Sequence, residues 1–302
     1  MKFTKMHGLG NDYIYVNGFE EHVDDPPALA RAVSDRHTGI GSDGLILIRP
    51  SDKADIRMEM YNTDGSRARM CGNGIRCVAK YAVEHGLTTG LNVLIETDAG
   101  VKVAECHIVD GVVQSVRVDM GRPSLAPSAI PSTISADRIV NHPLRIALPE
   151  PRALTRAEPQ TETEPRASAR AELRTEYAVT CVSMGNPHAV VFVDDVDAIA
   201  LDVIGPQFEH APQFPERINA HFVRVDSPEH VTMKTWERGS GITRACGTGA
   251  CAVCVAGAVT GRTRRTIIAT LPGGDLELEW ADNDHVYMTG PAVEIFTGDW
   301  HE

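Results

Sequence analysis

Arg69-Met70-Cys71-Gly72-Asn73-Gly74 and Arg244-Ala245-Cys246-Gly247-Thr248-Gly249 are the two stretches that decide the fold of this chain. Each places one cysteine and two glycines at the start of a helix-like run, which continues over residues 75–86 and 250–261. The two cysteines are 175 positions apart, and Gly10-Asn11 recurs as Gly185-Asn186 at the same interval. A third echo, Asp64-Gly65-Ser66 against Arg238-Gly239-Ser240, is offset by 174. These repeats predict two related lobes, each contributing one cysteine to a shared site.

A cysteine at the start of a helix has a chemical advantage. The first backbone N–H groups of a helix have no intrahelical partner, and the helix dipole adds about half a positive charge at that end. These groups can stabilise a thiolate and lower a thiol pKa from about 8.5 to roughly 3.5–7.5. They can also bind a carboxylate. We therefore expect a carboxylate site with Cys71 on one side and Cys246 on the other.

Length and composition limit the classes of protein to consider. The 302 residues suit about two domains, and the net charge of −12 without a basic tract argues against nucleic acid or an anionic membrane as partner. The N-terminus has no apolar signal-peptide core, and the longest apolar run, 250–259, is about half of the ~20 residues that a membrane helix needs. Seven cysteines, an odd number, favour free thiols in a reducing compartment, and hence the cytoplasm.

Hydrophobic patterning predicts an α+β protein with many short strands and few helices. Residues 150–176 contain hardly any large apolar side chain, so we expect a mobile surface insertion there, with no function assigned. Helices are expected at 27–37, 73–85 and 250–261, and strands at 3–17 in two pieces, 45–48, 56–61, 91–97, 101–108, 112–119, 177–182, 189–193, 221–225, 231–237, 266–271, 275–280 and 285–289, before a short tail.

Two further motifs are interpreted as structural. Residues 39–44 formally match G-x-G-x-x-G, but the motif follows a helix and opens a buried strand, whereas a dinucleotide site follows a strand and opens a helix. Cys251-x-x-Cys254 lies inside an apolar helix with no second C-x-x-C for a zinc site, so it is assigned to core packing. Three more cysteines are assigned to the core in the same way: Cys77, Cys106 and Cys181.

Two activated cysteines suit one reaction type better than others. A cysteine hydrolase needs a single nucleophile with a positioned histidine, and a dithiol oxidoreductase has no need of a carboxylate site. Proton exchange at a stereocentre needs a base and an acid on opposite faces of one carbon, which a pseudo-twofold pair supplies. The protonation of the two thiols would then be coupled. His188 follows the repeated Gly-Asn turn, although a lone histidine between apolar strand residues is more often structural.

The sequence resembles the diaminopimelate epimerase family over nearly the whole chain except 150–176. The motifs that carry the resemblance occur jointly and in order: His7-Gly8-Leu9-Gly10-Asn11-Asp12, Asn62 with Asp64-Gly65-Ser66, Met70-Cys71-Gly72-Asn73-Gly74, Ser183-Met184-Gly185-Asn186-Pro187-His188, Asn219, Glu237-Arg238-Gly239 and Ala245-Cys246-Gly247-Thr248-Gly249. The related proline racemases have a histidine at the position of Asn73, and the phenazine-biosynthesis-type isomerases lack the two cysteines.

The resemblance implies an isomerase that interconverts LL- and meso-2,6-diaminopimelate for lysine and peptidoglycan precursors, without pyridoxal phosphate, another cofactor or a metal. It implies two pseudo-symmetric lobes, each a curved, mostly antiparallel sheet or barrel around a central helix, with the site in the cleft between them. Residues 1–117, completed by 290–302, are expected to form the first lobe, and residues 118–289 the second. The family also suggests a homodimer.

The resemblance also implies roles for individual residues. Cys71 and Cys246 would be the acid/base pair, and backbone N–H groups of Gly72, Asn73, Gly247 and Thr248 would bind the carboxylate at the reacting centre. Glu237 would pair with the ammonium there, and His188 would support the thiols. The substrate's polar groups, chiefly at its distal end, would be held by Asn11, Asn62, Asn186, Asn219 and Arg238. Some relatives have a polar amide where this chain has Gly44, so binding through that loop is not expected.

Two alternatives stay open at this point. A racemase of another amino acid would share the cysteine pair, and Asn73 and Arg238 are the residues that discriminate against it. A non-catalytic amino-acid-binding relative is the second alternative, but such a protein would be expected to lack one of the cysteines. We also expect Cys71 and Cys246 to form a disulfide on oxidation, which would give an inactive protein.

Overall fold

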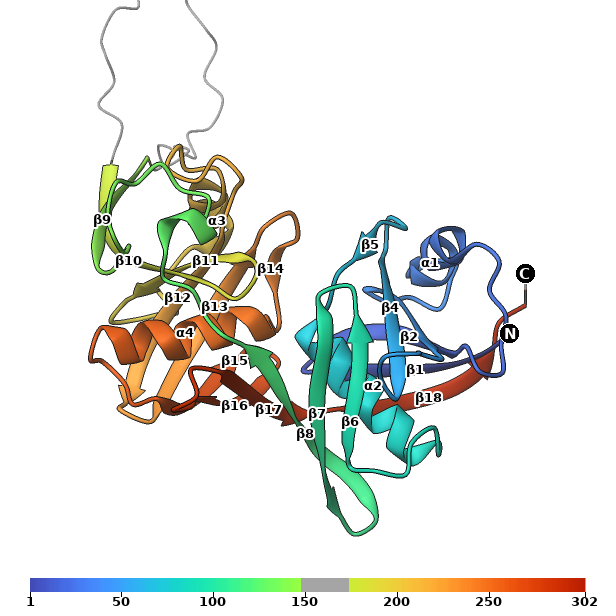
Figure 1. Cartoon of the computed structure of the whole chain (residues 1–302). Coiled ribbons are helices and arrows are strands. Elements are labelled where there is room, and N and C mark those ends of the chain that lie inside the picture. The colour runs from blue at the N-terminus through green and yellow to red at the C-terminus, as the bar shows by residue number, and fades with distance from the viewer. Residues whose placement is uncertain (148–173, 302) are drawn as a thin grey trace, which may run out of the picture.

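The computed structural model describes residues 1–147 and 174–301 and shows two lobes of an α+β fold (Figure 1). The first half of the chain contains β1 (Lys2–Gly8), β2 (Asn11–Asn17), α1 (Pro26–Ser34), β3 (Gly44–Arg49), β4 (Ile56–Asn62), β5 (Arg67–Ala68), α2 (Gly72–Glu84), β6 (Asn92–Thr97), β7 (Gly100–Val109) and β8 (Val112–Gly121). A short 3-10 turn, η1 (Pro127–Ala129), leads into the second half.

The second half contains β9 (His142–Ala147), β10 (Arg174–Ser183), β11 (Pro187–Phe192), α3 (Leu201–Glu209), β12 (Asn219–Ser227), β13 (His230–Glu237), β14 (Gly241–Thr243), α4 (Gly247–Val259), β15 (Thr266–Leu271), β16 (Gly274–Trp280), β17 (Val286–Pro291) and β18 (Val293–Asp299). The predicted strands and the three predicted helices are present, with small shifts at their ends.

The two halves repeat the same strand pairings. In the first half β2 is parallel to β3, β3 is antiparallel to β4, and β4 is parallel to β6. In the second half β11 is parallel to β12, β12 is antiparallel to β13, and β13 is parallel to β15. Helices α2 and α4 both have 13 residues. The duplication predicted from the 175-residue interval is therefore present in the topology.

The halves are joined by an exchange of strands. β8 of the first half pairs antiparallel with β17 of the second, and β18 of the second half pairs antiparallel with β1 of the first from Lys2 to His7. The expected short tail after 289 was wrong, because 293–299 form β18. Its alternation of apolar and polar residues is weak, and only its partner β1 fixes it as a strand. We propose lobe boundaries at 117/118 and 289/290, and the β1–β18 pairing supports the inclusion of 290–302 in the first lobe.

Helices α2 and α4 are largely buried, and each lies along strands of its own lobe (Figure 1). In α4 every residue from Gly249 to Gly257 is buried, and small side chains such as Ala250, Ala252 and Ala256 let strands approach closely. A helix that is apolar on all sides is stable only inside a core. Cys251 and Cys254 belong to this core, as predicted, and so do Cys77 and Cys106, whereas Cys181 is in a second cluster beneath α3.

Residues 39–44 form the predicted loop between α1 and β3. The backbone of this loop lies against α1, since Gly39 N–H donates to the carbonyl of Asp35 at 3.0 Å. A Cβ on Gly39 would lie 2.2 Å from the carbonyl oxygen of Ala32, so only glycine fits. The first glycine of the motif therefore serves close packing, and none of this geometry resembles a nucleotide-binding turn.

Helix α3 was missed by sequence reasoning. It contains Pro206, which lies inside the helix, removes one backbone hydrogen bond and argues against a helix on local grounds. Gly205 is required because Trp236 packs against it, with an added Cβ 2.3 Å from Trp236 Cδ2. Tertiary packing thus overrides weak local propensity at this helix.

The predicted insertion 150–176 lies mostly outside the described residues. Residues 174–176 do not belong to it, because they form the start of β10 and pair with β9. Glu176 accepts a hydrogen bond from Arg145 Nε at 3.0 Å across this pair. The strand therefore begins earlier than its apolar residues indicate.

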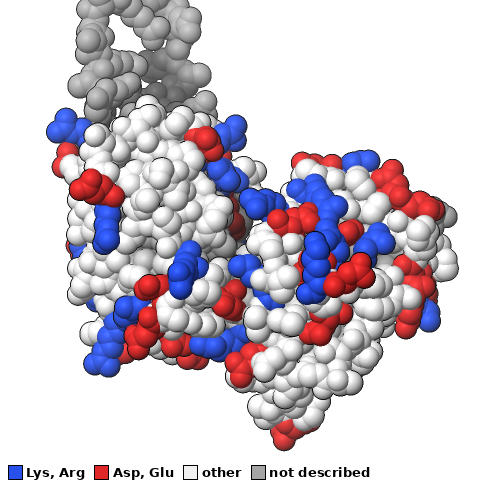
Figure 2. Space-filling view, viewed as in Figure 1, with Lys and Arg blue, Asp and Glu red and all other residues white. Residues whose placement is uncertain are grey.

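In the described part of the chain, no helix combines the length and apolarity required to cross a membrane. Figure 2 shows acidic and basic side chains interleaved on the visible face. On β4–β6, for example, Arg57 pairs with Glu59, Glu96 and Asp98, at 3.1, 2.6 and 3.0 Å. Neighbouring charges of opposite sign leave little net field over these strands.

Candidate active site

Both predicted cysteines are the N-cap residues of their helices. Cys71 has an extended backbone (φ −132°, ψ 122°), and its Sγ accepts a hydrogen bond from Gly74 N–H at 3.4 Å. Cys246 has a similar backbone (φ −120°, ψ 101°), but its Sγ has no cap hydrogen bond as close as that of Cys71, although Gly249 N–H still lowers the pKa of its thiol. The two halves therefore present the same element with a different thiol environment.

The two helix starts face each other across the lobes. A Cβ on Gly72 would lie 3.8 Å from Gly247 Cα, and a Cβ on Gly247 would lie 3.6 Å from Gly72 Cα. Asn73 Nδ2 donates to the carbonyl of Ala245 at 3.2 Å, which ties the first helix start to the second. A side chain at either glycine would also crowd Met288, whose Cε lies 3.1 Å from a Cβ on Gly72 and whose Sδ lies 3.1 Å from a Cβ on Gly247.

Asn11 connects the first turn to the first thiol. Its Oδ1 accepts from Cys71 Sγ at 3.4 Å and from Asn73 Nδ2 at 3.3 Å, and its Nδ2 donates to Asp43 Oδ2 at 2.8 Å. Asp43 was not predicted as a site residue, because residues 39–44 were interpreted as a structural loop. Its position after a glycine-rich loop was the available signal. Arg36 Nη2 holds the other Asp43 oxygen at 2.9 Å.

Asn186 occupies the equivalent place in the second half. Its Nδ2 lies 3.4 Å from Thr248 Oγ1, its Oδ1 lies 2.9 Å from His188 Nε2, and Thr248 Oγ1 lies 3.8 Å from Cys246 Sγ. His188 is hydrogen-bonded to Asn186, and one of its ring nitrogens lies within 4.8 Å of Cys246 Sγ. Both Gly-Asn turns thus reach the cysteine of their own half through an asparagine side chain.

The remaining predicted residues are placed differently. Glu237 Oε1 accepts from Thr243 Oγ1 at 2.6 Å and lies beside Cys246. Asn219 is buried and bonded to backbone, since it accepts from Arg238 N–H at 2.9 Å and donates to Pro187 O at 2.8 Å. Asn62 Nδ2 donates to Ser66 Oγ within its own turn. Asn219 therefore positions Arg238, and Asn62 is not hydrogen-bonded to the other predicted site residues.

Electrostatics at the two thiols depart from the expectation of lowered pKa values. Burial raises the pKa of Cys71, and the N–H groups of Gly74 and Asn73 only partly oppose this. Burial and the Glu237 carboxylate raise the pKa of Cys246 further above its ordinary value. Desolvation wins because both thiols lie between packed lobes, where a charge loses its hydration. Burial also raises the pKa of Glu237.

A buried cation near Cys71 was also missed. Arg76 is fully buried, and its guanidinium donates to Gly72 O at 3.0 Å, Asn73 Oδ1 at 3.1 Å and Pro291 O at 3.2 Å. These acceptors are neutral, so its charge acts on nearby thiols and lowers the pKa of Cys71. The position equivalent to Arg76 in α4 is Cys251, which makes the two halves electrostatically unequal.

We expect Cys71 to be alkylated faster than Cys246. Cys71 is partly exposed whereas Cys246 is 3% exposed, and Cys246 has the higher pKa because Glu237 adds to burial. Thiolate is the reactive form, so the alkylation rate of each cysteine should rise with pH. The rise for Cys246 should begin at a higher pH than the rise for Cys71. Peptide mass spectrometry after timed iodoacetamide treatment from pH 7 to 10 measures both. Equal rates at every pH would contradict the asymmetry.

One cluster in the site has the composition of a metal centre. His188, His221 and Cys246 each offer a ligand atom within 4.8 Å of the others, and all are buried. However, His188 Nδ1 and His221 Nε2 lie 2.9 Å apart, a hydrogen-bond distance. Two nitrogens at ~2.05 Å from a tetrahedral zinc would be about 3.3 Å apart. The cluster is therefore described as a hydrogen-bonded histidine pair.

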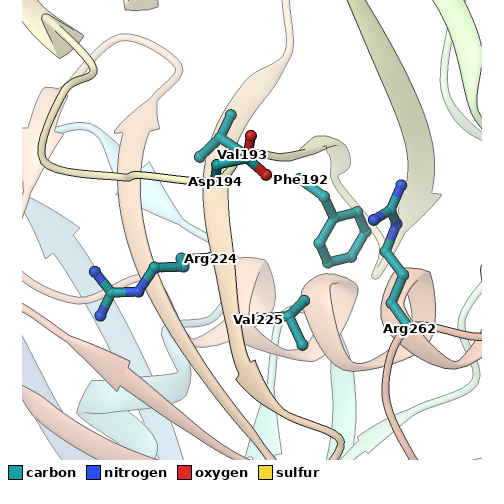
Figure 3. Close-up of a pocket in the computed structure, with 6 residues that line it drawn as sticks. All are labelled: Phe192, Val193, Asp194, Arg224, Val225 and Arg262. Carbon is teal, nitrogen blue, oxygen red and sulfur yellow. The ribbon is translucent and has the colours of Figure 1, made fainter.

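A surface pocket of about 210 Å³ lies at the opposite end of β11 from His188 (Figure 3). Its lining residues are Phe192, Val193, Asp194, Arg224, Val225 and Arg262. The Arg262 guanidinium carbon lies 4.9 Å from the centre of the Phe192 ring, and Arg224 pairs with Asp226 at 2.7 Å. None of the predicted site residues lines this pocket.

Comparison with known proteins agrees with this geometry. A family model described as diaminopimelate epimerase matches residues 3–126 and 180–295. The chain belongs to the diaminopimelate epimerase family. The diaminopimelate epimerase of Acetivibrio thermocellus is 51% identical over 300 residues, covering 99% of this chain and 98% of that protein. That of Agathobacter rectalis is 49% identical over 307 residues, covering 99% of both chains.

Solved structures show how far the fold extends beyond the diaminopimelate epimerase family. A probable proline racemase from Agrobacterium radiobacter matches with a TM-score of 0.66 at 14% identity, over 99% of this chain and 92% of that one. A PhzF-family phenazine biosynthesis protein from Bacillus anthracis matches with a TM-score of 0.63 at 14% identity, over 99% and 98%. At such low identity the likeness concerns the fold alone, and it confirms the predicted two-lobed α+β class.

Proposed function

We propose that the chain is a cofactor-independent epimerase that interconverts LL- and meso-2,6-diaminopimelate, in lysine and peptidoglycan precursor synthesis. The observation that carries this is the pair of N-cap cysteines on two helix starts whose glycines nearly touch. Cys71 and Cys246 come from equivalent positions of a duplicated fold, so a carbon held between them would meet one thiol on each face. Membership of the diaminopimelate epimerase family supplies the substrate.

The reaction consists of two proton transfers, one from the α-carbon to a cysteine and one from the other cysteine to the α-carbon. One cysteine, as thiolate, removes the α-proton and becomes a thiol. The other, as thiol, donates its proton to the opposite face of the carbon and becomes a thiolate. The reverse direction exchanges the roles, and the enzyme returns to its starting state when the first cysteine releases a proton to solvent and the second takes one up. Cys71 is the partly exposed member of the pair and offers the path for this proton.

Substrate binding would supply the charge that makes a thiolate. Both thiols have raised pKa values in the structure, since burial disfavours their charged forms. An α-ammonium bound beside Glu237 would place a positive charge near Cys246 and lower its pKa. Free N–H groups at the starts of α2 and α4, from Gly72, Asn73, Gly247 and Thr248, would bind the α-carboxylate and stabilise the charge that develops on it.

The distal end of the substrate would bind at Arg238. Its Nη1 donates to Glu216 O at 3.0 Å, and within residues 1–147 and 174–301 it forms no ion pair with a carboxylate. A guanidinium with remaining donors suits a bidentate carboxylate contact. Asn11, Asn62 and Asn186 would complete the polar surroundings, with Asn219 and His188 as supports. Gly44 contributes no side chain, and the space that a Cβ would need there is occupied by the Tyr61 carbonyl and the Tyr13 ring.

Proton exchange in D2O tests this function. LL-diaminopimelate is added to reduced protein without pyridoxal phosphate or added metal, and the α-hydrogens are followed by NMR. Two separate bases predict that deuterium enters the meso product much faster than it enters the remaining LL substrate. Failure to form the meso isomer, with conversion of another amino acid in a panel that includes proline, would assign the cysteine pair to a different racemase. No turnover of any panel member would favour a binding protein.

We also propose that the enzyme works in the cytoplasm as a homodimer. The dependence of the reaction on two free thiols favours a reducing compartment, and the family resemblance favours a dimer. β18 exposes Val293, Ile295 and Phe296 to between 41% and 47%, so apolar surface is available for association. Light scattering during size-exclusion chromatography measures the mass. A single species of about the 32.7 kDa chain mass at micromolar concentration would contradict the dimer.

A further inference from the structure

A buried chain of polar side chains links the far side of β13 to the second thiol. Thr235 Oγ1 lies 2.9 Å from His221 Nδ1, and His221 Nε2 lies 2.9 Å from His188 Nδ1. His188 Nε2 lies 2.9 Å from Asn186 Oδ1, and Asn186 Nδ2 lies 3.4 Å from the hydroxyl of Thr248. That hydroxyl is 3.8 Å from Cys246 Sγ.

The sheet holds this chain in place. His221 and Thr235 are cross-strand partners between β12 and β13, and β11 runs parallel to β12 and carries His188. His188 and His221 are 0% exposed and Thr235 is 2% exposed. The His221 ring also packs on the first turn of α4, where a Cβ on Gly249 would lie 2.2 Å from His221 Cε1. The glycine at 249 is therefore required by His221 as well as by the helix start.

Each link of the chain determines the direction of the next. Asn186 Oδ1 can only accept, so His188 carries its proton on Nε2. Burial lowers the pKa of His188 well below its ordinary value and that of His221 to about 3, so both rings are neutral. His188 Nδ1 must then accept a hydrogen bond from His221 Nε2–H, and His221 Nδ1 accepts a hydrogen bond from the hydroxyl of Thr235.

The direction of these hydrogen bonds decides to which group the Thr248 hydroxyl can donate. With Oδ1 held by His188, the amide of Asn186 turns Nδ2 toward Thr248 Oγ1, which accepts. The hydroxyl proton of Thr248 is then left for Cys246 Sγ. If these hydrogen bonds ran in the opposite direction, Asn186 would present its oxygen to Thr248 and accept the hydrogen bond from that hydroxyl. Cys246 would lose an O–H donor that stabilises its thiolate.

We propose that His221 is a positioning residue which, through His188 and Asn186, directs the hydroxyl proton of Thr248 to the sulfur of Cys246. The proposal rests on the proposed acid/base role of Cys246. No hydrogen bond joins His221 to Cys246, although a nitrogen of its ring lies within 4.8 Å of Sγ, and in this role His221 acts by fixing which nitrogen of His188 carries the proton. Gly249 N–H lowers the pKa of Cys246 as Gly74 N–H lowers that of Cys71, so the hydrogen-bond chain stands in the second half where Arg76 stands in the first.

Nitrogen-15 NMR of histidine-labelled protein tests the direction without any substrate. We expect both rings to be neutral from pH 6 to pH 9, with the proton on Nε2 and Nδ1 unprotonated in each. Spectra of His188→Asn and His221→Gln assign the two rings. Protonation on Nδ1 of either ring, or an imidazolium in this range, would overturn the proposal. This outcome does not depend on the identity of the substrate, so it is distinguishable from a failure of the proposed function.

Kinetics test the consequence for the thiol. In His221→Leu the donor to His188 is lost, and we expect kcat to fall about tenfold with KM nearly unchanged, as for one hydrogen bond to a charged group. His221→Gln keeps a donor amide and should recover most of kcat. His230→Gln is the control, since His230 is a partly exposed histidine of the same lobe, 3.0 Å from Thr270. Thermal melting of each variant shows whether it is folded.

A double-mutant cycle with Thr248→Val separates positioning from a general packing role. If His221 acts through the Thr248 hydroxyl, His221→Leu should cause no further fall in kcat once that hydroxyl is absent. Full additivity of the two losses would overturn the proposal, and so would equal losses of kcat in His221→Leu and His221→Gln. Should His221→Leu fail to fold, the NMR result and the comparison of His221→Gln with the unsubstituted enzyme still decide the matter.

Discussion

Cys71→Ala and Cys246→Ala should each reduce epimerisation of LL-diaminopimelate by about a thousandfold or more, since each removes one of the two groups that exchange protons with the α-carbon. General acid–base groups contribute about 10²–10⁴-fold each. No other side chain replaces either thiol, because Cys71 and Cys246 alone hold the N-cap positions at the helix starts that face each other. Conversion is followed by NMR in D2O or by separation of the isomers.

The matched control for these variants is Cys106→Ala. Cys106 is a buried cysteine of β7 in the same core cluster as α2, and it has no place in the proposed mechanism. Its alanine variant should retain activity within a few-fold. Circular dichroism shows whether each variant is folded. A Cys71→Ala or Cys246→Ala enzyme that is folded and keeps more than about a tenth of the activity would contradict the two-thiol mechanism.

Arg238→Gln should lower kcat/KM for diaminopimelate by about a hundredfold or more, mainly through KM. Hydrogen bonds to charged groups contribute about 1.5–3 kcal/mol each, and a bidentate carboxylate contact has two. The backbone of Arg238 is held by Asn219 and its side chain by Glu216 O, so the guanidinium is oriented before substrate binds. Glutamine keeps a polar amide but removes the charge and the planar fork.

Lysine provides a specific measurement for this prediction, because it is diaminopimelate without the distal carboxylate. The unsubstituted enzyme should discriminate strongly against lysine, and Arg238→Gln should reduce that discrimination by losing activity on diaminopimelate alone. Arg224→Gln is the control, since Arg224 pairs with Asp226 at the pocket beyond the far end of β11. An equal loss on both amino acids would show that Arg238 does not contact the distal carboxylate.

The duplication is exact in topology and unequal in chemistry. Tyr13 lies two residues after Asn11, and His188 lies two residues after Asn186, yet only His188 is hydrogen-bonded to a histidine. Arg76 in α2 corresponds to Cys251 in α4, so only one helix carries a buried cation. A symmetric scaffold with unequal thiols suits two isomers that present opposite faces of the carbon, because the acid and the base need not have the same pKa.

The sequence alone determined the duplication, the two helix starts and most strands, and it led to the proposed pair of thiols. Repeats at a fixed interval and glycines next to cysteines are local signals, which depend on backbone conformation and not on distant contacts. Prediction from the sequence was wrong for segments whose structure depends on partners elsewhere. β18 is fixed by β1, and α3 is fixed by Trp236.

Only the tertiary structure decided the electrostatics of the site and the side chains that set them. A helix start lowers a thiol pKa when it is solvated, but the packing of two lobes buries Cys71 and Cys246 and raises both values. Asp43, Arg76 and His221 reach the site through side chains from three separate elements. Desolvation and hydrogen-bond direction depend on which groups are brought together in space, and no spacing in the sequence encodes that.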